Sequence, residues 1–240
     1  MLTHTPVAYG DPDSGFEGLM VADARQTSTR PVVMVFHTIR GRTDFEEGKA
    51  RDLAAMGYIA FVVDLYGGGK TARSPEECRA LMDQLNEDRR LLWERIRASL
   101  DCARGLPGAD TRRMAAIGFC FGGKCVLDLA RSGADVAAVA SFHGLYDPPG
   151  LHAHTPIAAR VLVLHGWDDP LAPPESVLAL GQELTRKGAR WELIAYGHTG
   201  HAFTNPLAND PGKGLLFNPV SNERAWARML GFFGDAFQGK

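Results

Sequence analysis

A lone cysteine between two glycines, where an apolar run gives way to helix-like sequence, constrains this chain more than any other feature. The short apolar run 114–118 predicts the end of a strand, and Gly118 and Gly122 stand two residues to either side of Cys120. This G-x-nucleophile-x-G spacing is typical of a sharp strand-to-helix turn, in which small residues let strand and helix pack closely. Such a turn raises the nucleophile above the sheet and aims the next backbone N–H, here that of Phe121, at a developing oxyanion.

A structural role for Cys120 is the alternative. Free cysteine is among the most buried residue types and usually behaves as a small apolar side chain. The other three cysteines, Cys78, Cys102 and Cys125, fit that role. The two interpretations differ in what else they require, because a nucleophile elbow predicts an acid and then a histidine later in the chain.

An acid and a histidine do follow, in that order. Residues 159–165 form an apolar run that predicts a buried strand, and Asp168-Asp169 stand in the turn-rich segment behind it. Residues 190–196 predict another strand, followed by His198 and His201. Open α/β sheets place their sites just past the carboxyl ends of their strands, so all three groups are expected at one edge.

The acid and the base each have two candidates. Asp169, directly before Pro170, is favoured over Asp168, which is expected to cap the following turn or to be solvated. His201 lies in a Gly-His-Ala-Phe segment and is favoured over His198. A single loop histidine is most often solvent-exposed, so the assignment of either one depends on its combination with Cys120 and an acid.

These motifs resemble those of the dienelactone hydrolase family, a Cys-His-Asp branch of the α/β-hydrolase fold. The matching segments are Gly-Phe-Cys120-Phe-Gly-Gly, Asp64-Leu-Tyr66-Gly, His-Gly-Trp-Asp-Asp169-Pro and Gly-His201-Ala-Phe. Their order matches from about residue 32 to the C-terminal helix. The resemblance implies an eight-stranded, mostly parallel sheet with helices on both faces, in a monomer without a cofactor.

Two positions depart from the dienelactone-cleaving members. Thr38 stands where those enzymes carry a Glu that helps to ionise the thiol, and a threonine hydroxyl does not take up a proton at neutral pH. Asn205 stands where they carry an Arg that holds a substrate carboxylate. Arg40 is a candidate to supply positive charge from another side. The resemblance therefore leaves dienelactone itself open as a substrate.

The chemistry expected from these residues is acyl transfer to water. His201, oriented by Asp169, is expected to deprotonate Cys120, and the thiolate then attacks an ester, lactone or thioester carbonyl. The oxyanion hole is predicted from the backbone N–H groups of Phe121 and Ile39.

The pocket walls are expected from the loops after the strands. Thr38, Tyr66 and Trp167 lie in such loops, where each either contacts substrate or simply packs. No metal site is predicted, because the histidine pairs of the chain have no cysteine or carboxylate nearby at ligand spacing.

Length and composition predict a single domain spanning residues 1–240, since 45% apolar residues can bury a sizeable core. An N-terminal hairpin is expected from residues 5–9 and 16–22 with a turn at 10–15, and further strands at 32–37, 58–64 and 136–142. The predicted helices are 45–56, a long charged helical region from 75 to 105, and an amphipathic helix at 221–237.

Charge and cysteine content exclude several classes of protein. The net charge is −2 with both signs interleaved, unlike a nucleic-acid-binding surface. The apolar runs are too short to span a bilayer, and the first residues lack the basic and apolar regions of a signal peptide. Four scattered cysteines fit a reducing cytoplasm better than a disulfide framework. The expected partner is therefore a small-molecule ester or lactone.

Two other functions remain possible from the sequence. One is a non-catalytic relative of the same fold in which Cys120 is inert or senses redox state. The other is a binding or accessory subunit that uses the cleft without chemistry. Alkylation of Cys120 across pH and comparison of wild type with Cys120→Ala on p-nitrophenyl esters separate them from the hydrolase.

Overall fold

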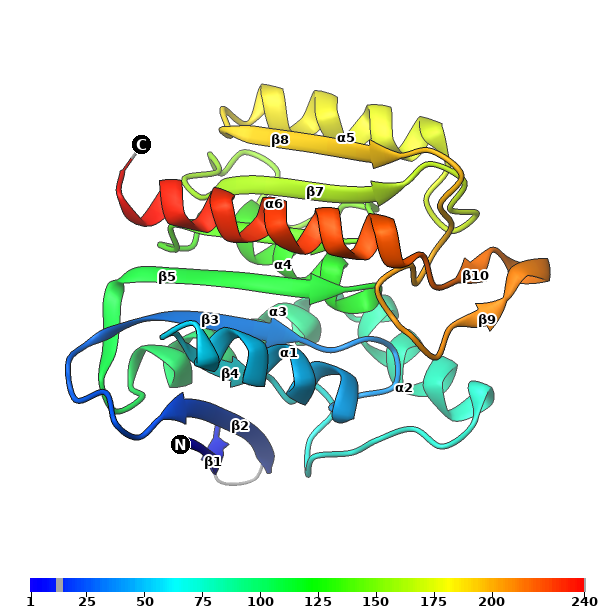
Figure 1. Ribbon diagram of the computed structural model, residues 1–240. Coiled ribbons are helices and arrows are strands. Elements are labelled where there is room, and N and C mark those ends of the chain that lie inside the picture. Colours follow the sequence, from blue (N-terminus) through cyan, green and yellow to red (C-terminus); the bar gives the residue numbers. More distant parts are fainter. Residues whose placement is uncertain (12–14, 240) are drawn as a thin grey trace. The chain divides into compact units, whose positions relative to one another are not determined.

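The computed structural model describes residues 1–11 and 15–239, which cluster into two compact units, Met1–Ala116 and Ile117–Lys240 (Figure 1). Strand β5 (Ala109–Phe119) begins in the first unit and ends in the second. The candidate nucleophile, acid and base all lie in the second unit.

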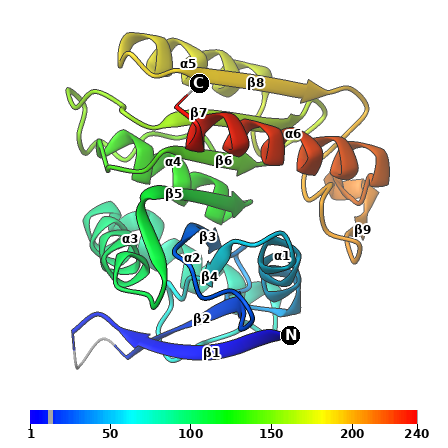
Figure 2. The same cartoon turned by 60° about the vertical axis from the view of Figure 1, so that its left-hand side comes forward.

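The first unit contains an N-terminal hairpin and a parallel strand pair. β1 (Leu2–Tyr9) and β2 (Phe16–Asp23) are antiparallel, β2 pairs antiparallel with β4 (Ile59–Val62), and β4 runs parallel to β3 (Arg30–Phe36). The expected hairpin is confirmed, although residues 12–14 of its turn lie outside the described residues. Helices α1 (Asp44–Ala55) and α3 (Arg89–Arg104) lie on opposite sides of these strands (Figure 2).

The long helical region predicted at 75–105 is two helices, because Asp88 interrupts it. α2 (Pro75–Glu87) ends at this residue, whose carboxylate then accepts a hydrogen bond from the Leu91 N–H at 2.9 Å and caps α3. The apolar face expected there is present, with Leu92 and Ile96 fully buried. The helical spacing of the apolar residues was therefore predicted correctly. The break at Asp88 was missed, because aspartate is also tolerated inside a helix.

The second unit is a parallel sheet covered on both faces. β6 (Ala138–Phe142) pairs with β7 (Arg160–Gly166), and β7 pairs with β8 (Trp191–Tyr196), all in parallel. Helix α6 (Pro219–Phe237) crosses one face of this sheet, and the elbow helix α4 (Phe121–Arg131) lies on the other (Figure 1). Parallel strands buried on both faces read as continuous apolar runs, which is why the sequence identified them.

One helix and a small hairpin of the second unit were not predicted. Helix α5 (Pro174–Arg186) follows a proline pair and buries Val177, Leu180 and Leu184 at helical spacing. That period was a readable signal. The short strands β9 (Asn209–Asp210) and β10 (Leu215–Leu216) flank a 3-10 turn at Pro211–Lys213, and two-residue strands carry no pattern to detect.

The predicted fold class is confirmed. Eight strands follow the order β1-β2-β4-β3-β5-β6-β7-β8, with the antiparallel pairings confined to β1, β2 and β4 among the pairs described. A parallel sheet with helices on both faces is the α/β arrangement that places loops, and hence sites, beyond the strand ends.

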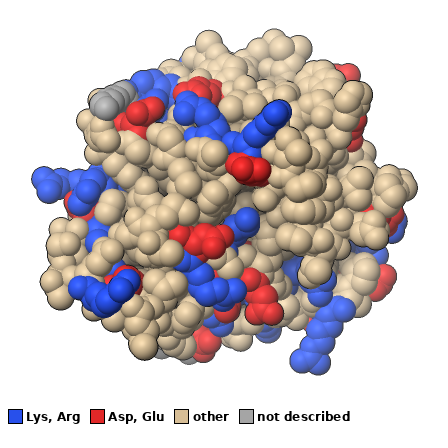
Figure 3. All heavy atoms as spheres, in the orientation of Figure 1, with Lys and Arg blue, Asp and Glu red and all other residues tan. Residues whose placement is uncertain are grey.

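The surface bears out the charge pattern of the sequence. On the face drawn in Figure 3, basic and acidic side chains alternate in small groups over a mostly uncharged surface. Among the described residues, no helix is both long and apolar enough to cross a membrane.

Candidate active site

Cys120 occupies a strained turn between β5 and α4. Its backbone has φ 56° and ψ −114°, a region that residues other than glycine rarely adopt. Its N–H donates to the Phe142 carbonyl of the neighbouring strand at 3.1 Å, and its carbonyl accepts from the Lys124 N–H at 3.3 Å. The side chain is nearly buried, with 9% of the residue exposed. The predicted strand–turn–helix elbow is therefore present.

The glycines around the cysteine are required by close backbone contacts. A Cβ on Gly118 would overlap the Gly122 carbonyl, and a Cβ on Gly123 would lie 2.7 Å from the Gly144 Cα. Strand, helix and the loop after β6 can approach this closely only without side chains.

The elbow directs the start of helix α4 toward the sulfur. Helix α4 begins at Phe121, directly after Cys120, and the cysteine side chain makes no capping hydrogen bond to it. The first N–H groups of a helix have no partners within the helix, and its N-terminus carries partial positive charge. The backbone N–H of Phe121 is thus suited to stabilise negative charge that develops beside the sulfur.

Asp169 and His201 form a buried pair. The His201 Nδ1–H donates to Asp169 Oδ2 at 2.7 Å, and the two side chains are 3% and 0% exposed. The other carboxylate oxygen, Oδ1, accepts from the Leu171 N–H at 2.8 Å. Hydrogen bonds hold both carboxylate oxygens in place. Asp169 therefore keeps the protonated Nδ1 of His201 directed at itself and leaves Nε2 available.

The backbone of His201 is fixed by a segment that the sequence did not identify. Its N–H donates to the Gly214 carbonyl at 2.8 Å, and its carbonyl accepts from the Leu216 N–H at 3.2 Å. Gly200 approaches the same segment so closely that a Cβ on it would overlap the Gly214 carbonyl. The segment of the small β9–β10 hairpin therefore holds the histidine loop, and its Gly214 also lies against Pro170 in the loop of the acid.

Electrostatics favour the protonated form of His201. Burial opposes it, but the negative charge of the Cys120 thiolate and hydrogen bonds with Asp169 and Cys120 outweigh burial and raise the pKa of His201 to about 10. The Nε2 atom is buried without a fully formed hydrogen bond among the described residues, so its contact with the Cys120 thiol is looser than the Nδ1–Asp169 bond. Sulfur, imidazole and carboxylate thus form one electrostatically coupled group.

A second buried pair lies beside the acid. The Tyr146 hydroxyl is 3.0 Å from His165 Nδ1, and His165 is fully buried at the end of β7. Burial lowers the pKa of His165, while burial and the Asp169 charge raise that of Tyr146 above its ordinary value. Both groups are therefore neutral at physiological pH, and they add no charge to the surroundings of Asp169.

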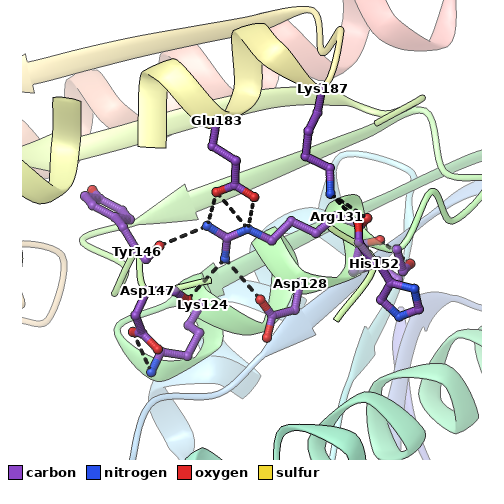
Figure 4. Close-up of polar contacts among 10 residues, drawn as sticks. Lys124, Asp128, Arg131, Tyr146, Asp147, His152, Glu183 and Lys187 are labelled. Atoms are coloured by element: carbon purple, nitrogen blue, oxygen red, sulfur yellow. Dashed lines mark hydrogen bonds and ion pairs between the residues drawn. The ribbon is translucent and has the colours of Figure 1, made fainter. Parts of the chain in front are cut away.

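The far end of the elbow helix is anchored by buried ion pairs (Figure 4). The Arg131 guanidinium, 1% exposed, donates to Glu183 on α5 at 2.7 Å and to Asp128 at 3.1 Å, and it reaches the Tyr146 carbonyl at 2.9 Å. Near the start of the helix, Lys124 Nζ lies 2.8 Å from a carboxylate oxygen of Asp147. Helix α4 is thereby fixed at both ends to the loop that follows β6.

The runner-up acid and base lie apart from this buried group. The His198 side chain is fully exposed and that of Asp168 is 54% exposed, with 3.9 Å between His198 Nδ1 and Asp168 Oδ2. Such an exposed pair is worth little in solution. The geometry therefore favours Asp169 and His201, as the sequence motifs did.

Two further residues that the sequence singled out, Trp167 and Asn205, lie in the second unit. Trp167 follows β7, is 47% exposed and donates its backbone N–H to the Tyr196 carbonyl at 2.9 Å. Asn205, at the position of the family arginine, accepts a hydrogen bond from the Leu207 N–H at 3.0 Å and so stabilises a turn.

Thr38, Ile39 and Tyr66 lie in the first unit, where they share one loop cluster. The Tyr66 hydroxyl donates to the Ile39 carbonyl at 3.1 Å, and the Thr38 N–H donates to a carboxylate oxygen of Glu46 at 3.0 Å. Glu46 is fully buried and also forms a capping box with Thr43 at the start of α1. These hydrogen bonds therefore hold the backbone on both sides of the Ile39 N–H within the first unit.

Asp64 organises the loop that carries Tyr66. Its buried carboxylate accepts four backbone N–H groups at 2.8–3.0 Å, those of Glu17, Tyr66, Gly67 and Gly69. A carboxylate that satisfies four donors fixes a loop whose glycines would otherwise leave it flexible. The sequence placed Asp64 in a family motif but gave no signal of this role.

No metal-binding cluster is present in the described part of the chain, since no three His, Cys, Asp or Glu side chains converge there.

Comparisons with known proteins point to one family. The model of the dienelactone hydrolase family matches residues 16–237. A putative carboxymethylenebutenolidase of Yersinia pestis is 27% identical over 220 residues, which is 87% of this chain and 79% of that protein. A solved structure named m3DLH is 37% identical with a TM-score of 0.93, covering 98% of this chain and 99% of its own. A dienelactone hydrolase-like promiscuous phosphotriesterase from metagenomic libraries is 33% identical, with a TM-score of 0.92 and 98% of both chains covered.

Proposed function

Because the chain belongs to the dienelactone hydrolase family, we propose that it cleaves a small ester, lactone or thioester through an acyl-enzyme on Cys120. The family resemblance and the class of hydrolase acting on ester bonds, both predicted from the sequence, are confirmed by this membership. The observation that carries the proposed mechanism is the buried His201–Asp169 hydrogen bond coupled electrostatically to the sulfur of an elbow cysteine.

In the proposed reaction, His201 holds the proton of the Cys120 thiol and the thiolate attacks the substrate carbonyl. The tetrahedral oxyanion accepts hydrogen bonds from the backbone N–H groups of Phe121 and Ile39, each worth about 3 kcal/mol in comparable enzymes. The imidazolium then protonates the leaving alkoxide, and the thioester remains on the sulfur. A water molecule, deprotonated by His201, attacks the thioester and releases the acid and the thiol.

This arrangement favours some substrates over others. An amine leaves less readily than a thiolate, so a cysteine nucleophile favours activated esters, lactones and thioesters over amides. Thr38 cannot ionise the thiol, and in our proposal the charge pairing of Cys120 with His201 serves this purpose instead. Thr38, Tyr66 and Trp167 are the side chains that we propose as pocket walls.

We further propose one hydrolase domain from residue 1 to 240, working as a monomer without a cofactor. The family model spans both compact units, which supports a single domain. All four cysteines are free thiols, which fits the reducing cytoplasm that we propose as the location.

The covalent intermediate provides the direct test. After mixing with p-nitrophenyl butyrate and an acid quench, the protein should gain the mass of one butyryl group on the elbow peptide. Trypsin cleaves after Lys124, so Cys120 and Cys125 fall in separate peptides, residues 114–124 and 125–131, and a mass gain on the first assigns the acyl group to Cys120. Hydrolysis without any trapped acyl group on Cys120 under single-turnover conditions would contradict the mechanism. An absence of turnover on esters, lactones, thioesters and a p-nitrophenyl phosphotriester alike would favour a non-catalytic protein with an inert or redox-sensing Cys120.

The raised pKa of His201 predicts an unusual pH profile. A folded-state pKa of about 10, above the ordinary 6.5, keeps the imidazolium charged through neutral pH and lets it lose its proton as the pH rises through 10. We therefore expect kcat/KM to persist into alkaline solution and to fall near pH 10, because the leaving alkoxide then finds no proton donor. Asp169→Asn removes one of the causes of the shift, so its alkaline limb should move to lower pH. An alkaline limb near pH 6.5 in the wild type would contradict the pairing.

A further inference from the structure

A second buried histidine stands between the strands that carry the nucleophile and the acid. His143 directly follows β6, and its N–H donates to the Leu164 carbonyl of β7 at 2.8 Å. The residue before it, Phe142, accepts the Cys120 N–H at 3.1 Å. The backbone of His143 is thus tied to the strand that leads to Asp169 and lies one residue from the strand contact of the elbow.

The backbone of His143 is held in a conformation that histidine rarely adopts. Its φ is +37°, in the left-handed region, and 1% of the residue is exposed. A strained conformation of this kind persists only where the surrounding structure determines it, and such residues cluster at functional sites. The strain directs the ring away from the sheet toward the histidine loop.

The ring of His143 contacts three residues of that loop. Its Nε2 lies 2.8 Å from the hydroxyl of Thr204, which is itself 1% exposed. The ring packs edge to face against His201, with centroids 4.9 Å apart and an interplanar angle of 68°, and against Phe203 at 5.2 Å and 76°. One side chain therefore both anchors the loop and lies against the candidate base.

These contacts restrict a motion of the His201 ring that the hydrogen bond to Asp169 does not restrict. The carboxylate holds Nδ1 of His201 at one point, and the ring can still tilt about that hydrogen bond and carry Nε2 away from the sulfur. A flat ring packed against the imidazole restricts this tilt. Misplacement of a catalytic group by about 1 Å can cost roughly 10²-fold in rate.

We propose that His143 is a positioning residue, which fixes the plane of the His201 ring and the loop behind it so that Nε2 stays directed at Cys120. This inference rests on the proposed function, in which His201 is the base. His143 does not touch the reacting atoms. It acts through the Thr204 hydrogen bond and the ring contact.

The test uses two variants that remove the hydrogen bond to Thr204 and keep a ring at position 143. His143→Phe keeps a ring and loses the hydrogen bond to Thr204, and Thr204→Val removes the same hydrogen bond from the other side with little change in volume. Each is expected to lower kcat about 10- to 100-fold with KM changed less than about 2-fold. The double variant should lose no more than the worse single variant, because both changes remove one interaction.

A titration distinguishes positioning from general support of the fold. The histidine NMR signal assigned by its loss in His201→Ala should titrate near pH 10 in the wild type and at lower pH in both variants, because the ring moves away from the Cys120 thiolate. The matched control is Thr199→Val. Thr199 is equally buried in the same loop and is 2.9 Å from Ser221 Oγ, so its replacement should lower the melting temperature but leave kcat and the His201 titration unchanged.

The outcomes are distinct. Lower kcat with a shifted His201 titration in His143→Phe and Thr204→Val supports the inference. Wild-type kcat and titration in folded Thr204→Val and His143→Phe proteins overturn it, as does an equal shift in Thr199→Val. If His143→Phe does not fold, Thr204→Val alone decides. The proposed function fails separately, through the absence of a Cys120 acyl-enzyme in the wild type.

Discussion

Replacing Cys120 with alanine should lower kcat/KM for p-nitrophenyl acetate by roughly 10⁴-fold or more, to the level of the uncatalysed reaction plus residual transition-state binding. The reason is that the proposed reaction proceeds through a bond to this sulfur, and alanine at the elbow offers no atom that can form one. Initial rates under saturating and subsaturating substrate provide the measurement, with the melting temperature as a check on folding.

Cys125→Ala is the matched control for that substitution. Cys125 is a buried thiol five positions further along the chain, and it lies within helix α4. Its removal should leave kcat/KM within about 2-fold while costing some stability, since a buried side chain is truncated. A Cys120→Ala protein with a tenth or more of the wild-type rate would show that the sulfur is not the nucleophile.

Replacing Arg131 with methionine should reduce the free energy of unfolding by about 3–5 kcal/mol. The guanidinium is 1% exposed and pairs with Glu183 at 2.7 Å and Asp128 at 3.1 Å, so its loss removes a buried positive partner of two largely buried carboxylates. Urea unfolding followed by circular dichroism measures the effect. Removing Glu183 and Asp128 together with Arg131, by leucine substitutions, should recover much of the loss, because the penalty comes from unpaired buried charge.

The control for Arg131 is another arginine ion pair at the surface. Arg112 is 91% exposed and lies 3.7 Å from an Asp110 oxygen, so Arg112→Ala should change the free energy of unfolding by less than about 1 kcal/mol. If Arg131→Met were as mild as Arg112→Ala, the buried ion pairs would not hold helix α4 in place.

The sequence predicted those parts of the protein that local chemistry dictates. Apolar runs located the parallel strands, because a strand buried on both faces has no polar positions. The glycines around Cys120 and the order of acid and histidine pointed to a strand–turn–helix at Cys120 and to Asp169 and His201, whose side chains are hydrogen-bonded to each other in the structure. The Thr43-x-x-Glu46 pattern is typical of a capping box, but no helix start was predicted from it, and only the structure connects it to Thr38.

What the sequence could not predict depends on contacts between distant segments. A single histidine after β6 carries no sign that its ring packs on His201, 58 positions away by chain number. The four N–H groups that Asp64 accepts come from two separate segments. Arg131 gave no signal either, since arginine is usually exposed and only the fold brings Glu183 to it.

The hairpin of β9 and β10 has a consequence for engineering this protein. The histidine loop is fastened at its two ends, by the Gly214 and Leu216 contacts with His201 and by the 3.1 Å hydrogen bond from the Asn218 N–H to the Phe203 carbonyl. Residues 205–213 lie between these hydrogen-bonded positions. That stretch contains β9, whose pairing with β10 keeps Gly214 and Leu216 beside His201, so exchanging it for another sequence should release the imidazole from its position.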